Sequence, residues 1–121
     1  MWQEFGRRLE RGEIATCDPV KFELLWIERD ASAIAARRDE LDALRTVASG
    51  ERVWRRALDV LELLAARGRL HHRQVRMPDL LIAAAAERAE LPLLHYDQHF
   101  EVIASVTGQE VRALAPLGSL P

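Results

Sequence analysis

The sequence predicts an α/β fold in which a short parallel sheet is flanked by helices. Short apolar segments that suit strands alternate with longer patterns that suit helices. The connections between the strands are too long for hairpins, which indicates parallel strands joined by crossovers. No internal repeat, low-complexity tract or linker interrupts this pattern, so residues 1–121 are expected to form a single domain.

The composition narrows the class of protein. The chain has 121 residues, of which 49% are hydrophobic, and a net charge of -2, which argues against disorder and gives no overall basic signal for nucleic acid. The single cysteine, Cys17, excludes an internal disulfide and a cysteine-based zinc site. No apolar run approaches the roughly 18 residues of a membrane span, and the N-terminus lacks the order of a signal peptide. We therefore expect a cytoplasmic protein without a membrane contact.

The first half of the chain is expected to alternate helices with two short strands. Trp2 and Phe5 begin a helical pattern among charged residues. Asp18 as the N-cap and Pro19 in the first turn predict the start of a second helix. The expected elements are a helix over 2–12, a strand over 13–17, helices over 18–29 and 31–44, and a short edge strand over 45–49.

The second half is organised around the run 80–86, which has no polar side chain and must therefore be buried. Four consecutive alanines favour a helix here, and Pro78 suits its first turn. The basic segment 69–76 leads into this helix and is interpreted as a solvated or phosphate-facing loop, because its two adjacent histidines are poorly placed to share a metal. The expected elements are helices over 51–67 and 78–90, a strand over 91–96, a helix over 99–107 and a strand over 110–114.

Three carboxylates stand at positions that favour a functional site. Asp79 lies at the head of the buried run, Glu23 lies on the side of its helix that should face inward, and Asp97 follows the strand 91–96. Ligands gather at the carboxyl ends of parallel strands. Without a glycine-rich phosphate loop or a nucleophile–base pair, such acids suit Mg²⁺ and phosphodiester hydrolysis. The alternatives are a carboxylate favoured by the helix dipole at Asp79 and a boundary residue at Glu23.

Three segments carry a resemblance to a known family. In order and spacing, they are similar to the PIN-domain ribonucleases of the VapC toxin type: ATCDPVKFELL at 15–25, PDLLIAAA at 78–85 and LHYDQHF at 94–100. The resemblance implies a three-layer sandwich. It also implies that Glu23, Asp79 and Asp97 are the catalytic residues and bind Mg²⁺, with Mn²⁺ as a possible substitute. The family often has a further acid where this chain has His99, so the role of His99 as an outer ligand stays open.

The N-terminal region departs from the family pattern. The family begins with an apolar strand that ends in an Asp-Thr or Asp-Ser pair and lies in the middle of the sheet, and nothing before Glu13 matches it. Residues 1–12 instead resemble the helix that precedes the family's second strand. We therefore expect either that the start of the sequence is misassigned or that the chain is truncated at its N-terminus relative to the family and lacks the central strand with its acid.

Two functions follow from the resemblance. The first is a Mg²⁺-dependent endoribonuclease, the toxin of a type II toxin–antitoxin pair, with RNA as substrate, a cognate antitoxin as partner and a homodimeric assembly. The alternative is a catalytically weak or inactive PIN-like protein that retains antitoxin binding or dimerisation. Four large aromatic residues are expected either to line a partner surface or to belong to the core: Trp2, Phe5, Trp26 and Trp54.

Overall fold

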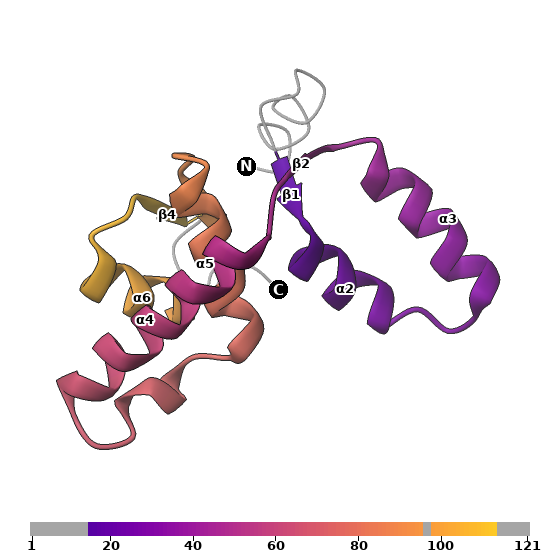
Figure 1. Ribbon diagram of the computed structural model, residues 1–121. Helices are drawn as coiled ribbons and strands as arrows, with labels where there is room; N and C mark the ends of the chain where they lie inside the picture. Colours follow the sequence, from indigo (N-terminus) through magenta and orange to yellow (C-terminus); the bar gives the residue numbers. More distant parts are fainter. Residues whose placement is uncertain (1–14, 96–97, 114–121) are drawn as a thin grey trace. The chain divides into compact units, whose positions relative to one another are not determined.

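The computed structural model describes residues 15–95 and 98–113, and its contacts divide the chain into two compact units (Figure 1). The first unit ends at Ala48 and the second begins at Ser49. Whether the two units form the single domain that the sequence predicts depends on how they pack, so the single domain stays a prediction. The helix expected over 2–12, with Trp2 and Phe5, lies outside the described residues.

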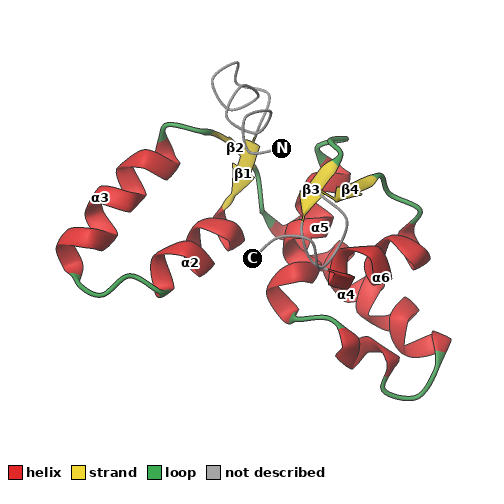
Figure 2. Cartoon of the chain, turned by 180° about the vertical axis from the view of Figure 1, so that it is seen from behind, coloured by secondary structure: helices red, strands yellow, loops and turns green. Residues whose placement is uncertain are grey.

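Unit 1 contains a parallel strand pair and two helices. Strand β1 (Ala15–Cys17) pairs with β2 (Arg45–Val47), and Thr16 lies opposite Thr46. Helices α2 (Asp18–Trp26) and α3 (Ala31–Asp42) connect the two strands as a helical crossover (Figure 2). The short strand expected over 45–49 is thus confirmed, and its parallel pairing agrees with the long connection.

The capping of α2 differs from the sequence prediction. Cys17 is the N-cap, with an extended backbone at φ -143° and no capping hydrogen bond from its side chain. Asp18 is already the first helical residue. The prediction of Asp18 as N-cap is therefore wrong by one position. Pro19 then occupies the second helical position, where its missing N–H leaves no helical hydrogen bond unmade. In α3, by contrast, Oδ1 of Asp30 accepts a hydrogen bond of 2.9 Å from the backbone N–H of Ala33.

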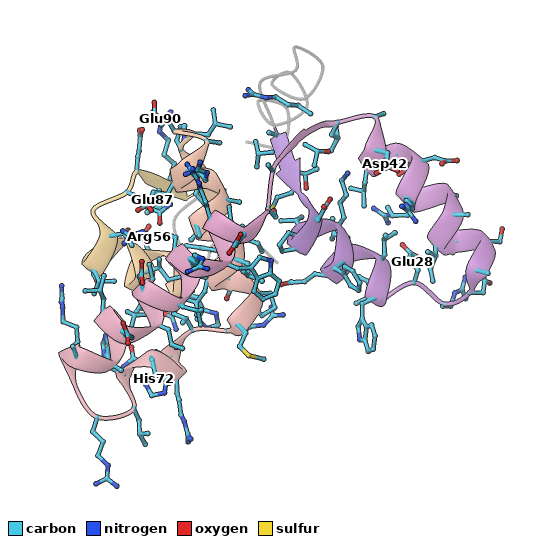
Figure 3. The ribbon with its side chains drawn as sticks, viewed as in Figure 1. Glu28, Asp42, Arg56, His72, Glu87 and Glu90 are labelled. Atoms are coloured by element: carbon cyan, nitrogen blue, oxygen red, sulfur yellow. The ribbon has the colours of Figure 1, made fainter. Side chains whose placement is uncertain are left out.

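Two ion pairs connect α3 to α2 and to the turn between the two helices. Nζ of Lys21 donates to Oδ1 of Asp42 at 2.9 Å, and Nε of Arg37 lies 3.2 Å from Oε1 of Glu28. The hydrogen bond from Lys21 lowers the pKa of Asp42. Asp42 is the last residue of α3, and Glu28 lies in the turn between α2 and α3 (Figure 3). Each pair has one largely exposed partner, Asp42 at 49% and Arg37 at 46%, and such pairs stabilise a fold only weakly. The described part of unit 1 therefore depends on its buried apolar side chains.

Unit 2 carries the larger helical core and a second parallel strand pair. Strand β3 (Leu93–His95) pairs with β4 (Val111–Ala113), and Leu93 lies opposite Val111. The helices are α4 (Glu51–Arg67), the 3-10 helix η1 (His71–Gln74), α5 (Met77–Arg88) and α6 (Gln98–Thr107). Helix α4 has the predicted bounds, and η1 forms where the sequence predicted a loop. Helix α6 ends at Gly108, whose φ of 74° suits glycine.

The alanine-rich helix α5 forms the centre of unit 2. Its residues Ala83, Ala84 and Ala85 are at most 3% exposed and Leu80 is also buried, which confirms the burial expected for these four positions of the run 80–86. The other three residues of the run are half-buried. Small side chains let neighbouring helices approach closely, and α5 packs against both α4 and α6. Those helices contribute the remaining buried side chains of the helical core, which are Val53, Ala57, Val60, Leu64, Phe100 and Ile103. Within the described residues, no helix is both long and apolar enough to cross a membrane.

A half-buried ion pair links α4 to α5. Nε of Arg56 donates to Oε1 of Glu87 at 2.6 Å, and Nη2 of Arg56 donates to Oε2 at 3.2 Å (Figure 3). This two-point contact raises the pKa of Arg56, because Glu87 favours the charged guanidinium. The contact joins residues 31 positions apart, so it fixes how the two helices pack.

We predict that Arg56→Met destabilises the protein more than Arg55→Met does. Arg55 makes a similar contact with Glu51, but that pair lies within α4 and is exposed. Loss of the half-buried pair should cost about 1 kcal/mol and loss of the exposed pair less than about 0.5 kcal/mol. Urea unfolding of both variants measures the difference, and equal losses would show that the Arg56 contact adds nothing to helix packing.

Candidate functional site

Asp79 is a buried carboxylate at the start of α5. It is the third residue of the helix and only 3% exposed. Its backbone N–H donates to the carbonyl of Arg76, which forms the N-cap. The positive end of the helix dipole favours a negative side chain at this point. The sequence prediction of an acid at the head of a buried helix is therefore confirmed.

A histidine from α6 contacts this carboxylate. Nδ1 of His99 lies 2.8 Å from Oδ2 of Asp79, and the imidazole is one-quarter exposed whereas the Asp79 side chain is 4% exposed. An ionised carboxylate can only accept hydrogen bonds, so the imidazole donates from Nδ1. Among the described residues, no hydrogen bond reaches the other oxygen, Oδ1. The pair thus holds one oxygen of the Asp79 carboxylate.

Glu23 and Asp97 are the other two predicted site residues. Glu23 is a half-buried residue of α2 in unit 1, whereas Asp79 belongs to unit 2. Asp97 lies outside the described residues. Within 15–95 and 98–113, no three acidic, histidine or cysteine side chains are grouped to hold a metal ion. The convergence of Glu23, Asp79 and Asp97 on one site accordingly stays a prediction.

A basic segment precedes Asp79 in the chain. Between Glu62 and Asp79 the sequence has four arginines and no acidic residue. All four are exposed, and Arg67 donates to the carbonyl of Ser105 at 2.7 Å. Within η1, the side chains of His71 and Gln74 hydrogen-bond at 3.2 Å (Figure 3 shows the neighbouring His72). The segment offers exposed guanidinium groups that can contact phosphate.

Unit 1 contains an apolar groove between α2 and α3. Its volume is about 490 Å³, and its lining includes Phe22, Leu25, Trp26 and Ile34. Lys21, Arg38, Asp18 and Asp42 add charged groups of both signs. Trp26 is 83% exposed, so the interpretation of this residue as core is wrong. The same holds for Trp54 on α4, which is 57% exposed.

The contact between Asp79 and His99 was missed by sequence reasoning. The two residues are 20 positions apart, on different helices, and no local pattern connects them. The available signal was the position of His99 in the first turn of a helix that follows the strand, close to the predicted Asp97. That signal indicated a role near the site but gave no partner.

Comparison with known families identifies the fold. The model of the family described as PIN domain matches residues 2–106, a span that crosses both units. The chain belongs to the PIN domain family. The predicted resemblance and the predicted α/β class are thereby confirmed, and the parallel strand pairs and flanking helices agree with them.

Relatives of this PIN domain include three from Mycobacterium tuberculosis. Ribonuclease VapC18 of strain ATCC 25618 / H37Rv is 38% identical over 112 residues, which cover 93% of this chain and 82% of the relative. Ribonuclease VapC21 of the same strain is 39% identical over 114 residues, with coverages of 92% and 80%. Ribonuclease VapC51 of that strain is 37% identical over 111 residues, with coverages of 92% and 79%. The similarity therefore extends over most of each protein.

Proposed function

We propose that this PIN domain is a Mg²⁺-dependent endoribonuclease that acts in the cytoplasm as the toxin of a type II toxin–antitoxin pair. The observation that carries the proposal is the buried Asp79 carboxylate at the head of α5, in a chain whose relatives are named ribonucleases. A carboxylate in this environment suits a hard divalent cation, and phosphodiester hydrolysis is a reaction that such a cation assists.

Glu23, Asp79 and Asp97 are the proposed Mg²⁺ ligands and catalytic residues. The donor set fits this cation, because Mg²⁺ prefers carboxylate oxygens and keeps several water molecules. Bound Mg²⁺ would activate a water molecule and neutralise charge on the phosphate. The chain itself contributes the fixed Asp79 carboxylate, whose burial limits its motion. Clustered acids repel one another without a cation, so binding should stabilise the fold.

The proposed substrate is RNA, held in part by the basic segment. Arg73 and Arg76 are exposed, and Arg76 is the N-cap of the helix that carries Asp79. Their guanidinium groups can contact two oxygens of one phosphate. The rest of the chain adds no net positive charge, so backbone contacts should be concentrated in this segment. This arrangement would hold the RNA backbone close to the acidic site.

The proposed partners are a cognate antitoxin and a second copy of the chain. The groove between α2 and α3 is concave and apolar, which suits an antitoxin segment that inserts a side chain beside Trp26. On α4, Trp54 and Leu58 are 57% and 60% exposed and lie one helical turn apart. Such an apolar strip can pack on its own copy across a two-fold axis, so we assign it to the homodimer.

We predict that Asp79→Asn abolishes metal-dependent cleavage of RNA and the stabilisation by metal. Mg²⁺ or Mn²⁺ should raise the melting temperature of the unaltered protein, since the cation binds the native state. Glu23→Gln and Asp97→Asn should behave like Asp79→Asn, while Asp39→Asn, an exposed acid of α3, should behave like the unaltered protein. Gel assays of RNA cleavage and thermal melts in EDTA, Mg²⁺ and Mn²⁺ measure both effects.

Two results would separate the candidate functions. Metal binding without cleavage by the unaltered protein would favour the alternative, a PIN-like protein that retains only partner binding. An equal rise in melting temperature for Asp79→Asn would place the cation elsewhere and would remove Asp79 from the proposed site.

We predict that Arg73→Gln combined with Arg76→Gln lowers the affinity for RNA and makes that affinity less dependent on salt concentration. Each lost phosphate contact should reduce the slope of log K against log salt by about 0.7 for a single strand. Binding is measured by fluorescence anisotropy with a labelled single-stranded RNA, in the Asp79→Asn background to prevent cleavage. Arg88→Gln, which removes an exposed arginine at the far end of α5, is the matched control. An unchanged slope in the double variant would exclude the basic segment from the RNA contact.

We predict a homodimer that Trp54→Ser combined with Leu58→Ser dissociates. Trp26→Ser in the groove should leave the dimer intact, because the groove is assigned to the antitoxin. Sedimentation velocity over a range of concentrations measures both variants. A monomer at high concentration for the unaltered chain would contradict the dimer, and dissociation by Trp26→Ser alone would move the dimer contact to unit 1.

A further inference from the structure

We infer that His99 is a positioning residue of the proposed metal site: its imidazole holds Oδ2 of Asp79 and thereby leaves Oδ1 for a divalent cation. The inference rests on the proposed function and concerns a residue that the three-acid site does not include. The contact that carries it is the 2.8 Å hydrogen bond between Nδ1 of His99 and Oδ2 of Asp79.

The hydrogen bond joins two helix starts within unit 2. Asp79 is in the first turn of α5, and His99 is the second residue of α6. The two helices pack on each other, and a second bond, from Nε2 of Gln109 to the carbonyl of Ala83 at 3.0 Å, joins the chain beyond α6 to α5. Both partners of the His99 bond therefore stand on rigid elements, which is the requirement for holding a ligand in one orientation.

The bond also favours one carboxylate oxygen over the other as the ligand of a cation. Rotation about the Cβ–Cγ bond of an aspartate exchanges the positions of its two carboxylate oxygens. A donor fixed on one oxygen opposes that rotation. Because one lone pair of Oδ2 accepts from the imidazole N–H, Oδ1 is the oxygen with more capacity left for a ligand. An ordered carboxylate loses less entropy when the cation binds, so the cation affinity increases.

The chemistry of the donor suits a site for a hard cation. Burial of a charged carboxylate is unfavourable unless a hydrogen bond compensates it, and His99 provides this bond before any cation is present. An imidazole donor achieves this without a second negative charge next to Asp79. An aspartate at position 99 would instead place two carboxylates against each other, a contact that only a cation could relieve.

The first test compares His99→Asn with His99→Leu in the full chain. The two replacements have similar size, but only asparagine keeps an N–H donor. With Mn²⁺ as the probe, His99→Leu should lose about 10- to 100-fold in affinity by isothermal titration, and His99→Asn should stay within about 3-fold of the unaltered protein. Equal affinities for the leucine variant and the unaltered protein would overturn the inference.

A matched control separates positioning from stability. Gln109→Leu removes a side-chain hydrogen bond to the same helix, α5, away from the Asp79 carboxylate. It should lower the melting temperature without changing the Mn²⁺ affinity. A loss of affinity as large as that of His99→Leu would show that any loosening of α5 has this effect, and the specific role of His99 would be excluded.

A variant with an acidic residue at position 99 tests whether this position faces the Asp79 carboxylate. His99→Asp should lower the melting temperature in EDTA, because the two carboxylates repel, and should enlarge the rise that Mg²⁺ produces. A melting temperature in EDTA equal to that of the unaltered protein would show that position 99 does not face Asp79 in solution.

A nuclear magnetic resonance measurement tests the contact without metal or RNA. A long-range ¹H–¹⁵N correlation spectrum of the unaltered protein should show His99 with its proton on Nδ1, and Asp79→Asn should change that resonance. A proton on Nε2 alone would overturn the inference, even if the leucine variant failed to fold. If the protein bound no metal and cleaved no RNA but showed the Nδ1 proton, the proposed function would fail while the contact stood.

Discussion

The burial of α5 is the constraint on which unit 2 depends. Its alanines can leave water only if α4 and α6 approach closely, and that approach fixes where the first turn of α5 lies. The Arg56–Glu87 pair then limits sliding of α4 along α5. As a result, the Asp79 carboxylate is held by the packing of a whole helix.

In the first turn of α5, the interactions that stabilise the buried Asp79 carboxylate are also the ones that orient it. A buried acid needs compensation, and here the helix dipole and the imidazole of His99 provide it. The same two interactions restrict the carboxylate to one orientation. The structural interpretation of Asp79 as a helix-start carboxylate and its proposed role as a ligand are therefore compatible, because the features that stabilise the charge would also orient it for a cation.

The two units differ in how they are held together. Unit 2 has a continuous core of helices, whereas the described part of unit 1 buries mainly Thr16, Cys17 and Leu41 and joins its helices through exposed ion pairs. A unit with so small a core leaves large apolar side chains on its surface, of which Trp26 is the clearest example. This distribution supports the proposal that the antitoxin contacts the groove of unit 1, while unit 2 carries the fixed carboxylate and the proposed dimer strip on α4.

The sequence by itself determined the α/β class, the bounds of α4 between Gly50 and Gly68, and the burial of the alanine run with Asp79 at its head. These features follow from composition and local periodicity, which act over a few residues. Only the tertiary structure decided that Trp54 is exposed and that His99 reaches Asp79 across 20 positions. Periodicity gives a helix an apolar face but does not say which neighbour covers it, and a hydrogen bond between two helix starts exists only after both helices have packed.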